Sequence, residues 1–463
     1  MDTEANKSIT RKLDCRIVPI VMSLYFVNFL DRVNIGNSKL YGLEEDLALV
    51  GNQYQICVAV LFIPYCLLEV PSTLIIKKAK PNRFLAIIAV CWGLVATLSG
   101  LCKSYGSLVA LRLAMGALES GLYPSLVIYL TTFYSRKQLA VRLGYVSIGS
   151  ALSGAVGGII AYGVGFLDGV SGLRAWRWLM IVEGIPSVIV GVLAYFVLPT
   201  TPESARFLNA DERAKFAILR NEASGQTQDA DEFHWADVKD GIRDWQIWIF
   251  ALSGFTNNIM LYGFSTFLPT IIRNLGQWST VESQAMTTPV HALGIGTYLI
   301  VAYFSDRNQH RGIYICSFGL LGITGFCLLI ANHGPALSYT GCFLIDVAMF
   351  VMCTLTVAWL AGNKPRHGKR AFATGAFLTI ANSAGIVAPF LYPNRDAPTF
   401  YTGYGVSIGC LSVSVSIHAF MSWYYTSVNR ARAHGKEDWK LEGRTEAEIA
   451  EMGDWSPKFV YST

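Results

Sequence analysis

The sequence predicts an all-α membrane protein with twelve transmembrane helices arranged as two halves of six. Charged residues make up only 15% of the 463 residues, whereas soluble proteins carry about 25%. Hydrophobic residues make up 52%, and the mean hydropathy is +0.40. The apolar runs are also long, and an uncharged run of roughly 20 residues crosses a bilayer as a helix. These features together indicate a polytopic membrane protein.

The order of the apolar segments predicts the organisation of the chain. A polar stretch, Pro199 to Asp244, separates the sixth segment from the seventh and is expected to be a cytoplasmic linker that contains an amphipathic helix, "DERAKFAILRNEAS". The twelve segments lie near 17–38, 53–76, 84–102, 107–133, 140–166, 178–198, 246–272, 284–304, 312–332, 336–361, 371–392 and 402–427. The predicted parts are an N-terminal tail (1–16), a six-helix bundle (17–198), the linker (199–244), a second six-helix bundle (245–428) and a charged C-terminal tail (429–463) that is expected to be mobile.

The distribution of lysine and arginine predicts the orientation in the membrane. With the N-terminus in the cytoplasm, the inner segments hold 29 of the 37 Lys and Arg residues and the outer segments hold 6. Positive residues accumulate in cytoplasmic loops, so both termini are predicted to be cytoplasmic. The formal net charge of +5 therefore reflects topology, and no nucleic-acid partner is expected.

The spacing of the ten cysteines does not indicate a framework of disulfide bonds. They occur singly, mostly in apolar segments, with no Cys-x-x-Cys pair and no His/Cys cluster, so neither disulfides nor a metal site is expected. The first apolar run has no small-residue cleavage site, which makes it a first span and not a signal peptide. We found no nucleophile–base pair or cofactor loop in the sequence, so we expect no cofactor and no enzyme activity.

Charged residues inside the predicted spans are the main candidates for function. A charge at the centre of a membrane helix costs roughly 2.5–3.5 kcal/mol, and such residues mark substrate or ion pathways. Arg112 and Glu119 are seven residues apart and return to nearly the same helix face. A guanidinium suits a carboxylate ligand because it is a planar two-pronged donor, and a buried glutamate can exchange a proton. The alternative is that the two residues only pair with each other.

Other polar residues within the spans are weaker candidates. Asp31 and Arg32 lie in "FVNFLDRVNIGN", which we interpret as the floor of a substrate cavity. Three further polar residues could form hydrogen bonds either to a substrate or between neighbouring helices: Asn258, Tyr262 and Asn382. Two acids towards the cytoplasmic side of their helices are interpreted as structural ion-pair partners: Glu69 and Glu183.

Several of these motifs resemble those of one family. The sequence resembles major facilitator superfamily transporters and, within them, the fungal allantoate permease family of anion:cation symporters, from about Leu13 to Tyr461. The resemblance is carried by "YFVNFLDRVNIGN", "LRLAMGALESGLYPS", "FYSRKQLAVRLGY", "WRWLMIVEGIPS", "LPTTPESARFL", "YGFSTFLPTII", "KRAFATG" and "GDWSPKFVYS".

The resemblance implies roles for matching residues. In this family, arginines at the positions of Arg32 and Arg112 contact the anion, and acids at the positions of Asp31 and Glu119 handle the proton. The loop signature of the superfamily matches "FSDRNQHR" and implies gating contacts for three residues: Asp306, Arg307 and Arg311. The corresponding stretch after the second span, "IIKKAKPNR", has no Asp, so the gating contacts of the first half stay open.

The resemblance also implies a function. It is proton-coupled uptake of a small organic anion, such as allantoate, nicotinate or a related vitamin, by alternating access. The expected setting is the plasma membrane, with the bilayer, the anion and the proton as partners and the chain acting as a monomer. Tyr25, Tyr65, Tyr123 and Trp359 are candidates to stack on a substrate ring, although a chain with 13% aromatic residues places several in any cavity.

Two other functions stay open at this point. One is a proton antiporter that exports a fungal metabolite. The antiporter signature G-P-x-x-G-G is absent from the fifth span, where "GSALSGAVGGIIAYG" has Ala155 in place of the proline. The other is a nutrient sensor without transport, although such sensors carry long cytoplasmic extensions and neither tail here exceeds roughly 35 residues.

Overall fold

The structure is a computed structural model, and every regular element in its described residues is a helix. It describes residues 3–78, 80–134, 136–201, 235–276, 278–397 and 399–463, with a few residues of the linker. Contacts divide the chain into two compact units. The first consists of residues 1–226 and 266–292, and the second of residues 227–265 and 293–463.

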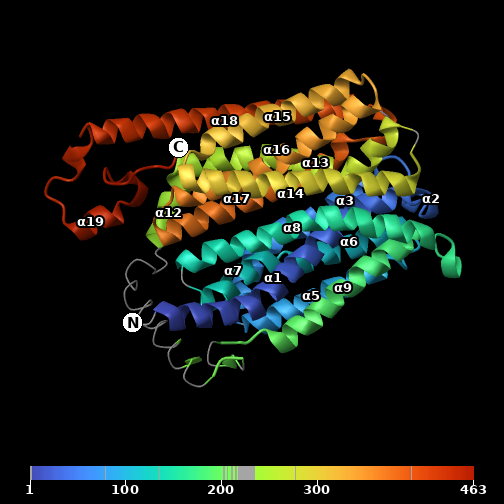
Figure 1. Cartoon of the computed structure of the whole chain (residues 1–463), viewed down its shortest axis with the longest axis horizontal. Coiled ribbons are helices and arrows are strands. Elements are labelled where there is room, and N and C mark those ends of the chain that lie inside the picture. Colours follow the sequence, from blue (N-terminus) through green and yellow to red (C-terminus); the bar gives the residue numbers. More distant parts are fainter. Residues whose placement is uncertain are drawn as a thin grey trace. The chain divides into compact units, whose positions relative to one another are not determined.

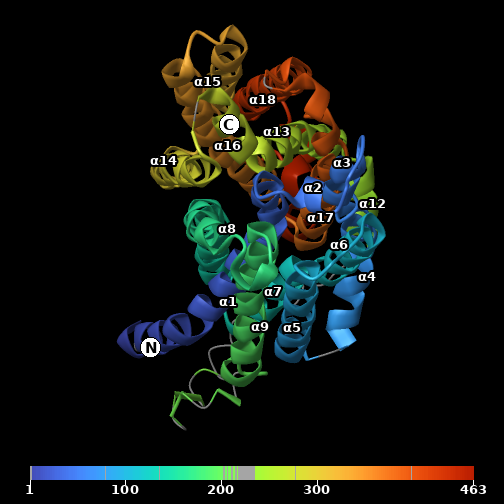
Figure 2. The same cartoon turned by 90° about the vertical axis from the view of Figure 1, so that its right-hand side faces the viewer.

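The first nine helices belong to the first unit. They are α1 (Thr3–Leu40), α2 (Leu43–Asp46), α3 (Gln53–Ala59), α4 (Phe62–Lys78), α5 (Pro81–Ser99), α6 (Tyr105–Glu119), α7 (Leu122–Phe133), α8 (Arg136–Val164) and α9 (Ala175–Val197). Helix α5 packs along α9, and α1 packs on both α8 and α9 (Figures 1 and 2). The small Gly93 of α5 allows this approach, because a side chain there would overlap the backbone of Val188 in α9.

The second unit contains most of the remaining helices. They are α12 (Trp235–Arg243), α13 (Trp245–Leu275), α14 (Thr280–Asn308), α15 (Arg311–Ala331), α16 (Pro335–Gly362), α17 (His367–Val387), α18 (Tyr401–Ala433) and α19 (Glu446–Glu451). The end of α13 and the start of α14, residues 266–292, group with the first unit. Within the second unit, α15 packs between α16 and α18.

The predicted fold class is confirmed. Eleven helices in the described residues are long and apolar enough to cross a membrane. Several of the exposed large hydrophobic residues lie on these helices, as a lipid-facing surface requires. The chain is therefore a multi-pass membrane protein.

The predicted second span, 53–76, is broken into α3 and α4. Pro64, in the first turn of α4, has no N–H to bond the carbonyl of Val60, which lies in the intervening turn. The Cys57 carbonyl at the end of α3 accepts a hydrogen bond from Arg112 Nε at 3.2 Å. The break therefore coincides with a contact to a candidate functional residue.

Two polar parts of the chain, the linker after α9 and the C-terminal tail, were predicted to lie outside the helical bundles. The predicted linker helix "DERAKFAILRNEAS" lies mostly outside the described residues. The tail was predicted to be mobile from Asn429, but α18 continues to Ala433 and residues 453–463 pack against the second unit. That prediction is wrong because buried ion pairs, described below, fix the end of the tail.

Candidate functional site

The carboxylate of Glu119 pairs with Arg32, not with Arg112. Arg32 lies in α1, and its Nη2 and Nε atoms donate to Glu119 Oε2 at 2.8 and 3.2 Å. Both side chains are buried, with 7% and 1% of their surface exposed. Glu119 Oε1 has no hydrogen-bond partner among the described residues. The pair thus leaves one oxygen of the predicted proton-coupling acid unsatisfied.

Arg112 lies on the same helix as Glu119, two turns earlier. It is 2% exposed, and its Nε and Nη1 atoms contact the Cys57 carbonyl at 3.2 Å and Met115 Sδ at 3.6 Å. No carboxylate in the described part of the chain lies within ion-pair distance of it, although Glu119 and Arg32 are near enough to interact electrostatically. A buried guanidinium without a carboxylate partner is the kind of group that an anionic ligand satisfies.

Asp31, the neighbour of Arg32 in α1, faces a different set of partners. Its Oδ2 atom accepts hydrogen bonds from Ser187 Oγ in α9 at 2.6 Å and from Trp92 Nε1 in α5 at 3.1 Å. Oδ1 has no partner in the described residues. Asp31 interacts electrostatically with Glu119 and with Arg112, so the candidate acids and arginines of the first unit form one network.

The two acids predicted to be structural, Glu69 and Glu183, are both buried. Glu183 lies on α9 one turn before Ser187, and it interacts electrostatically with Asp31. Neither of its carboxyl oxygens meets a hydrogen-bond donor in the described residues. The ion pair that the sequence predicts for Glu183 is therefore not found among the described residues.

Aromatic rings surround the Arg32 guanidinium. Its Cζ atom lies 4.7 Å from the ring centroid of Tyr65, 5.1 Å from that of Phe29 and 5.8 Å from that of Phe62. Tyr25 contacts Phe29 and Tyr123, with centroids 5.2 and 5.6 Å apart. Three of the four predicted stacking candidates therefore belong to one aromatic group, which we call the Arg32 aromatic group: Tyr25, Phe29, Phe62, Tyr65 and Tyr123. The fourth, Trp359 in α16, stacks on His418 instead.

The candidate substrate ligands of the second unit lie on α13 and α17. Tyr262 Oη donates to Asn382 Oδ1 at 2.8 Å. Asn258 is buried one helical turn before Tyr262. The structure thus joins two of the three side chains by a hydrogen bond, which also links the two helices.

The residues of the loop signature join the end of α14 to the next two helices. Arg311 Nη2 donates to Asp306 Oδ1 at 2.8 Å, and its Nη1 atom donates to the carbonyl of Ala358 in α16. Arg307 is exposed. This arrangement fits a fixed helix corner, while the gating role stays a prediction.

The sequence analysis missed a polar network between helices α13, α16 and α18. Ser414 Oγ donates to Asn257 Oδ1 at 2.6 Å, and Asn257 Nδ2 donates to Thr356 Oγ1 at 3.3 Å. His418 contacts Thr356 Oγ1 through Nε2 at 3.1 Å. Ser414 and His418 lie one turn apart on one helix, and this spacing is a signal that the sequence offers.

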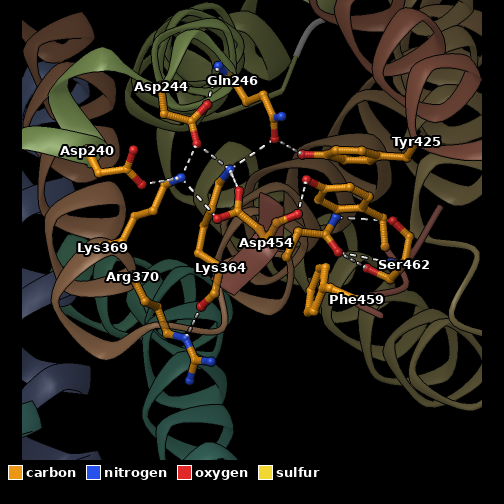
Figure 3. Close-up of polar contacts among 12 residues, drawn as sticks. Asp240, Asp244, Gln246, Lys364, Lys369, Arg370, Tyr425, Asp454, Phe459 and Ser462 are labelled. Atoms are coloured by element: carbon orange, nitrogen blue, oxygen red, sulfur yellow. Dashed lines mark hydrogen bonds and ion pairs between the residues drawn. The ribbon is translucent and has the colours of Figure 1, made fainter. Parts of the chain in front are cut away.

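A cluster of buried charges at one end of the second unit was also missed. It consists of Lys364, Lys369, Asp244 and Asp454, with 0–1% of each side chain exposed, and is shown in Figure 3. Burial alone would raise the pKa of Asp244, but the ammonium groups of Lys364 and Lys369 outweigh burial and hold its pKa below the usual range. We call these four residues the lysine–aspartate cluster.

Long apolar helices that bury arginines and acids define a membrane transporter, and comparisons with known proteins agree. The profile of the Major Facilitator Superfamily matches residues 21–389. An uncharacterized transporter of Schizosaccharomyces pombe is 40% identical over 412 residues, which are 89% of this chain and 82% of that protein. The high-affinity nicotinic acid transporter of Saccharomyces cerevisiae is 30% identical over 98% of this chain and 84% of its own length.

Solved structures show the same fold. The crystal structure of a D-xylose-proton symporter superposes with a TM-score of 0.66 at 14% identity, covering 88% of this chain and 96% of that one. The chain belongs to the Major Facilitator Superfamily. It is therefore a transporter and not an enzyme, as predicted, and the predicted resemblance to the superfamily is confirmed.

Proposed function

We propose that this transporter takes up a small organic anion together with protons by alternating access. The observation that supports it best is Arg112, which is 2% exposed and meets no carboxylate among the described residues. An anionic carboxylate of a substrate can supply two acceptors for this guanidinium. In this proposal Arg32 assists in holding the anion. The roles of Asn258, Tyr262 and Asn382 as substrate ligands stay predictions.

The charges of the first unit favour coupling to a proton. Within the spans of the first unit, two buried arginines, Arg32 and Arg112, accompany four buried acids, Asp31, Glu69, Glu119 and Glu183. A bound anion adds one uncompensated negative charge in a buried site, which is costly. A proton on Glu119 would remove this charge, so binding of the anion and binding of the proton would favour each other.

The Arg32 aromatic group favours a substrate with a flat ring. Its rings lie beside the guanidinium that we propose to hold the anion, and ring faces attract one another and cations. A relative 30% identical is named as a nicotinic acid transporter. We therefore propose an aromatic or heterocyclic carboxylate as the substrate class, within the range that the allantoate permease resemblance implies.

Uptake of labelled nicotinate and nicotinamide by cells that express the protein tests this proposal. The two compounds share a ring and differ in the carboxylate that Arg112 would bind. Hydrogen bonds to a charged group contribute about 1.5–3 kcal/mol, so we expect uptake of nicotinate to exceed that of nicotinamide by at least about tenfold. A panel of other organic acids, each offered at two external pH values, extends the test.

The direction of the pH effect distinguishes the open alternatives. Proton-coupled uptake requires faster accumulation at the lower external pH. Reduced accumulation, with faster efflux from preloaded cells, would indicate the proton-antiport exporter. Saturable binding without any flux would indicate a sensor.

The orientation of the chain gives a separate prediction. From the excess of Lys and Arg in alternate loops, we expect both termini to be cytoplasmic. We propose the plasma membrane as the location, because the proposed activity is uptake into the cell. Because residues 461–463 are packed against the second unit, epitope tags belong after Asp2 and after the exposed Glu442. Neither tag should bind antibody in intact cells, and both should bind it after permeabilisation. Labelling of intact cells at either position would contradict the orientation.

A further inference from the structure

Each ammonium group of the lysine–aspartate cluster has three acceptors. Lys364 Nζ lies 2.6 Å from Asp244 Oδ2, 2.7 Å from Asp454 Oδ2 and 2.9 Å from Gln246 Oε1. Lys369 Nζ lies 2.9 Å from one oxygen each of Asp454, Asp244 and Asp240. An ammonium group has three N–H donors, so both lysines are saturated. Asp454, from the C-terminal segment, provides one acceptor to each.

Two asparagines of the second unit hold the backbone of this segment. Asn429 Oδ1 accepts from Tyr461 N at 2.9 Å, and its Nδ2 atom donates to Tyr461 O at 2.8 Å. Asn363 makes the same pair of contacts with Ser462, at 2.9 Å to the N–H and 3.1 Å to the carbonyl. Each side-chain amide thus pairs with a backbone amide as a neighbouring strand would. Such pairing is typical of a site that binds an extended peptide.

A ring and an arginine complete the contacts. Tyr461 is 3% exposed, and its ring stacks on that of Tyr425 in α18, with centroids 4.4 Å apart and planes 15° apart. Arg432, also in α18, donates to the carbonyls of Phe459 at 2.7 Å and Asp454 at 3.0 Å. The segment is therefore held along its length, and four of its residues are buried: Asp454, Ser456, Pro457 and Tyr461.

We propose that the second unit contains a peptide-binding groove for which residues 453–463 are the built-in ligand. The groove is formed by the end of α12, the loop between α16 and α17, and α18. It takes a peptide that begins with a short 3-10 turn, Gly453–Trp455, with an aspartate in that turn and a tyrosine seven residues later. When residues 453–463 are bound, they hold the end of α12, the loop between α16 and α17, and α18 together. When they are released, Lys364 and Lys369 each lose one hydrogen-bond acceptor.

The balance of buried charges shows why the lysine–aspartate cluster is more stable when residues 453–463 are bound. Without Asp454, the buried Lys364 and Lys369 would share Asp244 and the partly exposed Asp240. Removing one partner from a buried ion pair is strongly destabilising, because the remaining charge is left uncompensated. Asp454 therefore contributes specificity for this segment in addition to the backbone contacts.

Hydrogen exchange of the full chain in nanodiscs, followed by mass spectrometry, tests the groove. In the native protein, fragments covering 453–463 should exchange at least about hundredfold more slowly than the same peptide free in solution. Asp454→Asn keeps the shape and removes the charge, and it should speed exchange of the segment at least about tenfold. Glu442→Gln, an exposed acid in the same tail, is the matched control and should change nothing.

Two outcomes would overturn the proposal: exchange at the free-peptide rate in the native protein, or an unchanged rate in Asp454→Asn. If Asp454→Asn fails to reach the membrane, Tyr461→Ala replaces it, because this change removes the stacked ring without leaving a charge unpaired. An excess of synthetic peptide 453–463 should also bind the variant, whereas the same peptide with asparagine at position 454 should not. Equal binding of both peptides would contradict the role of Asp454.

Discussion

Replacing Arg112 by lysine is expected to abolish uptake of the anion while the protein still reaches the membrane. An ammonium group keeps the charge but lacks the planar two-pronged geometry that matches a carboxylate. Loss of one hydrogen bond to a charged group removes about 1.5–3 kcal/mol of binding free energy. This loss lowers the affinity for the anion roughly 10- to 100-fold. The same loss is expected for Arg112→Ala. The measurement is initial uptake of labelled substrate, normalised to the amount of protein at the cell surface.

Arg142→Lys provides the matched control for this experiment. Arg142 forms a two-pronged pair with Asp14, with Nη2–Oδ2 and Nε–Oδ1 distances of 2.5 and 3.0 Å. It joins α8 to α1 and lies outside the proposed binding site, so Arg142→Lys should affect stability more than transport. Near-normal uptake by Arg112→Lys would show that Arg112 has a structural role, since its contacts with Cys57 and Met115 do not need a guanidinium fork.

Hydropathy predicted the spans well because each long apolar run must bury its backbone polar groups in a helix. It did not show the break within 53–76, where Pro64 and the Cys57 carbonyl interrupt the helical hydrogen bonds. Pro64 was visible in the sequence. The contact with Arg112 was not, because it joins residues 55 positions apart.

The candidate site was only partly predictable for a similar reason. Helical periodicity correctly placed Arg112 and Glu119 on one helix, both buried. It could not show that α1 brings Arg32 to Glu119 across 87 positions of sequence. The tail was harder still, because charged residues such as Lys364 and Asp454 look solvated until their partners are known. Burial of such charges depends on tertiary pairing, which one sequence does not show.

The second prediction with a large effect concerns the protonation of Glu119. Glu119→Gln imitates the permanently protonated acid and keeps a carbonyl oxygen that can accept from Arg32, at the position where Oε2 now accepts at 2.8 Å. Substrate binding and exchange of labelled for unlabelled substrate across the membrane should therefore survive. Accumulation driven by a pH gradient should be lost, because the variant has no proton to release at this site.

The expected size of this loss follows from the energy in the gradient. One pH unit is worth about 1.4 kcal/mol per proton, which allows accumulation of at most about tenfold for each proton carried. Native protein in vesicles should approach this ratio, and Glu119→Gln should stay near the ratio for passive equilibration. Glu183→Gln is the control, because Glu183 is equally buried but meets no donor in the described part of the chain, and this variant should keep its coupling. If Glu119→Gln still concentrates substrate in response to the gradient, the coupling acid lies elsewhere. Asp31, the other acid that the resemblance links to the proton and which contacts Trp92 and Ser187, then becomes the leading candidate.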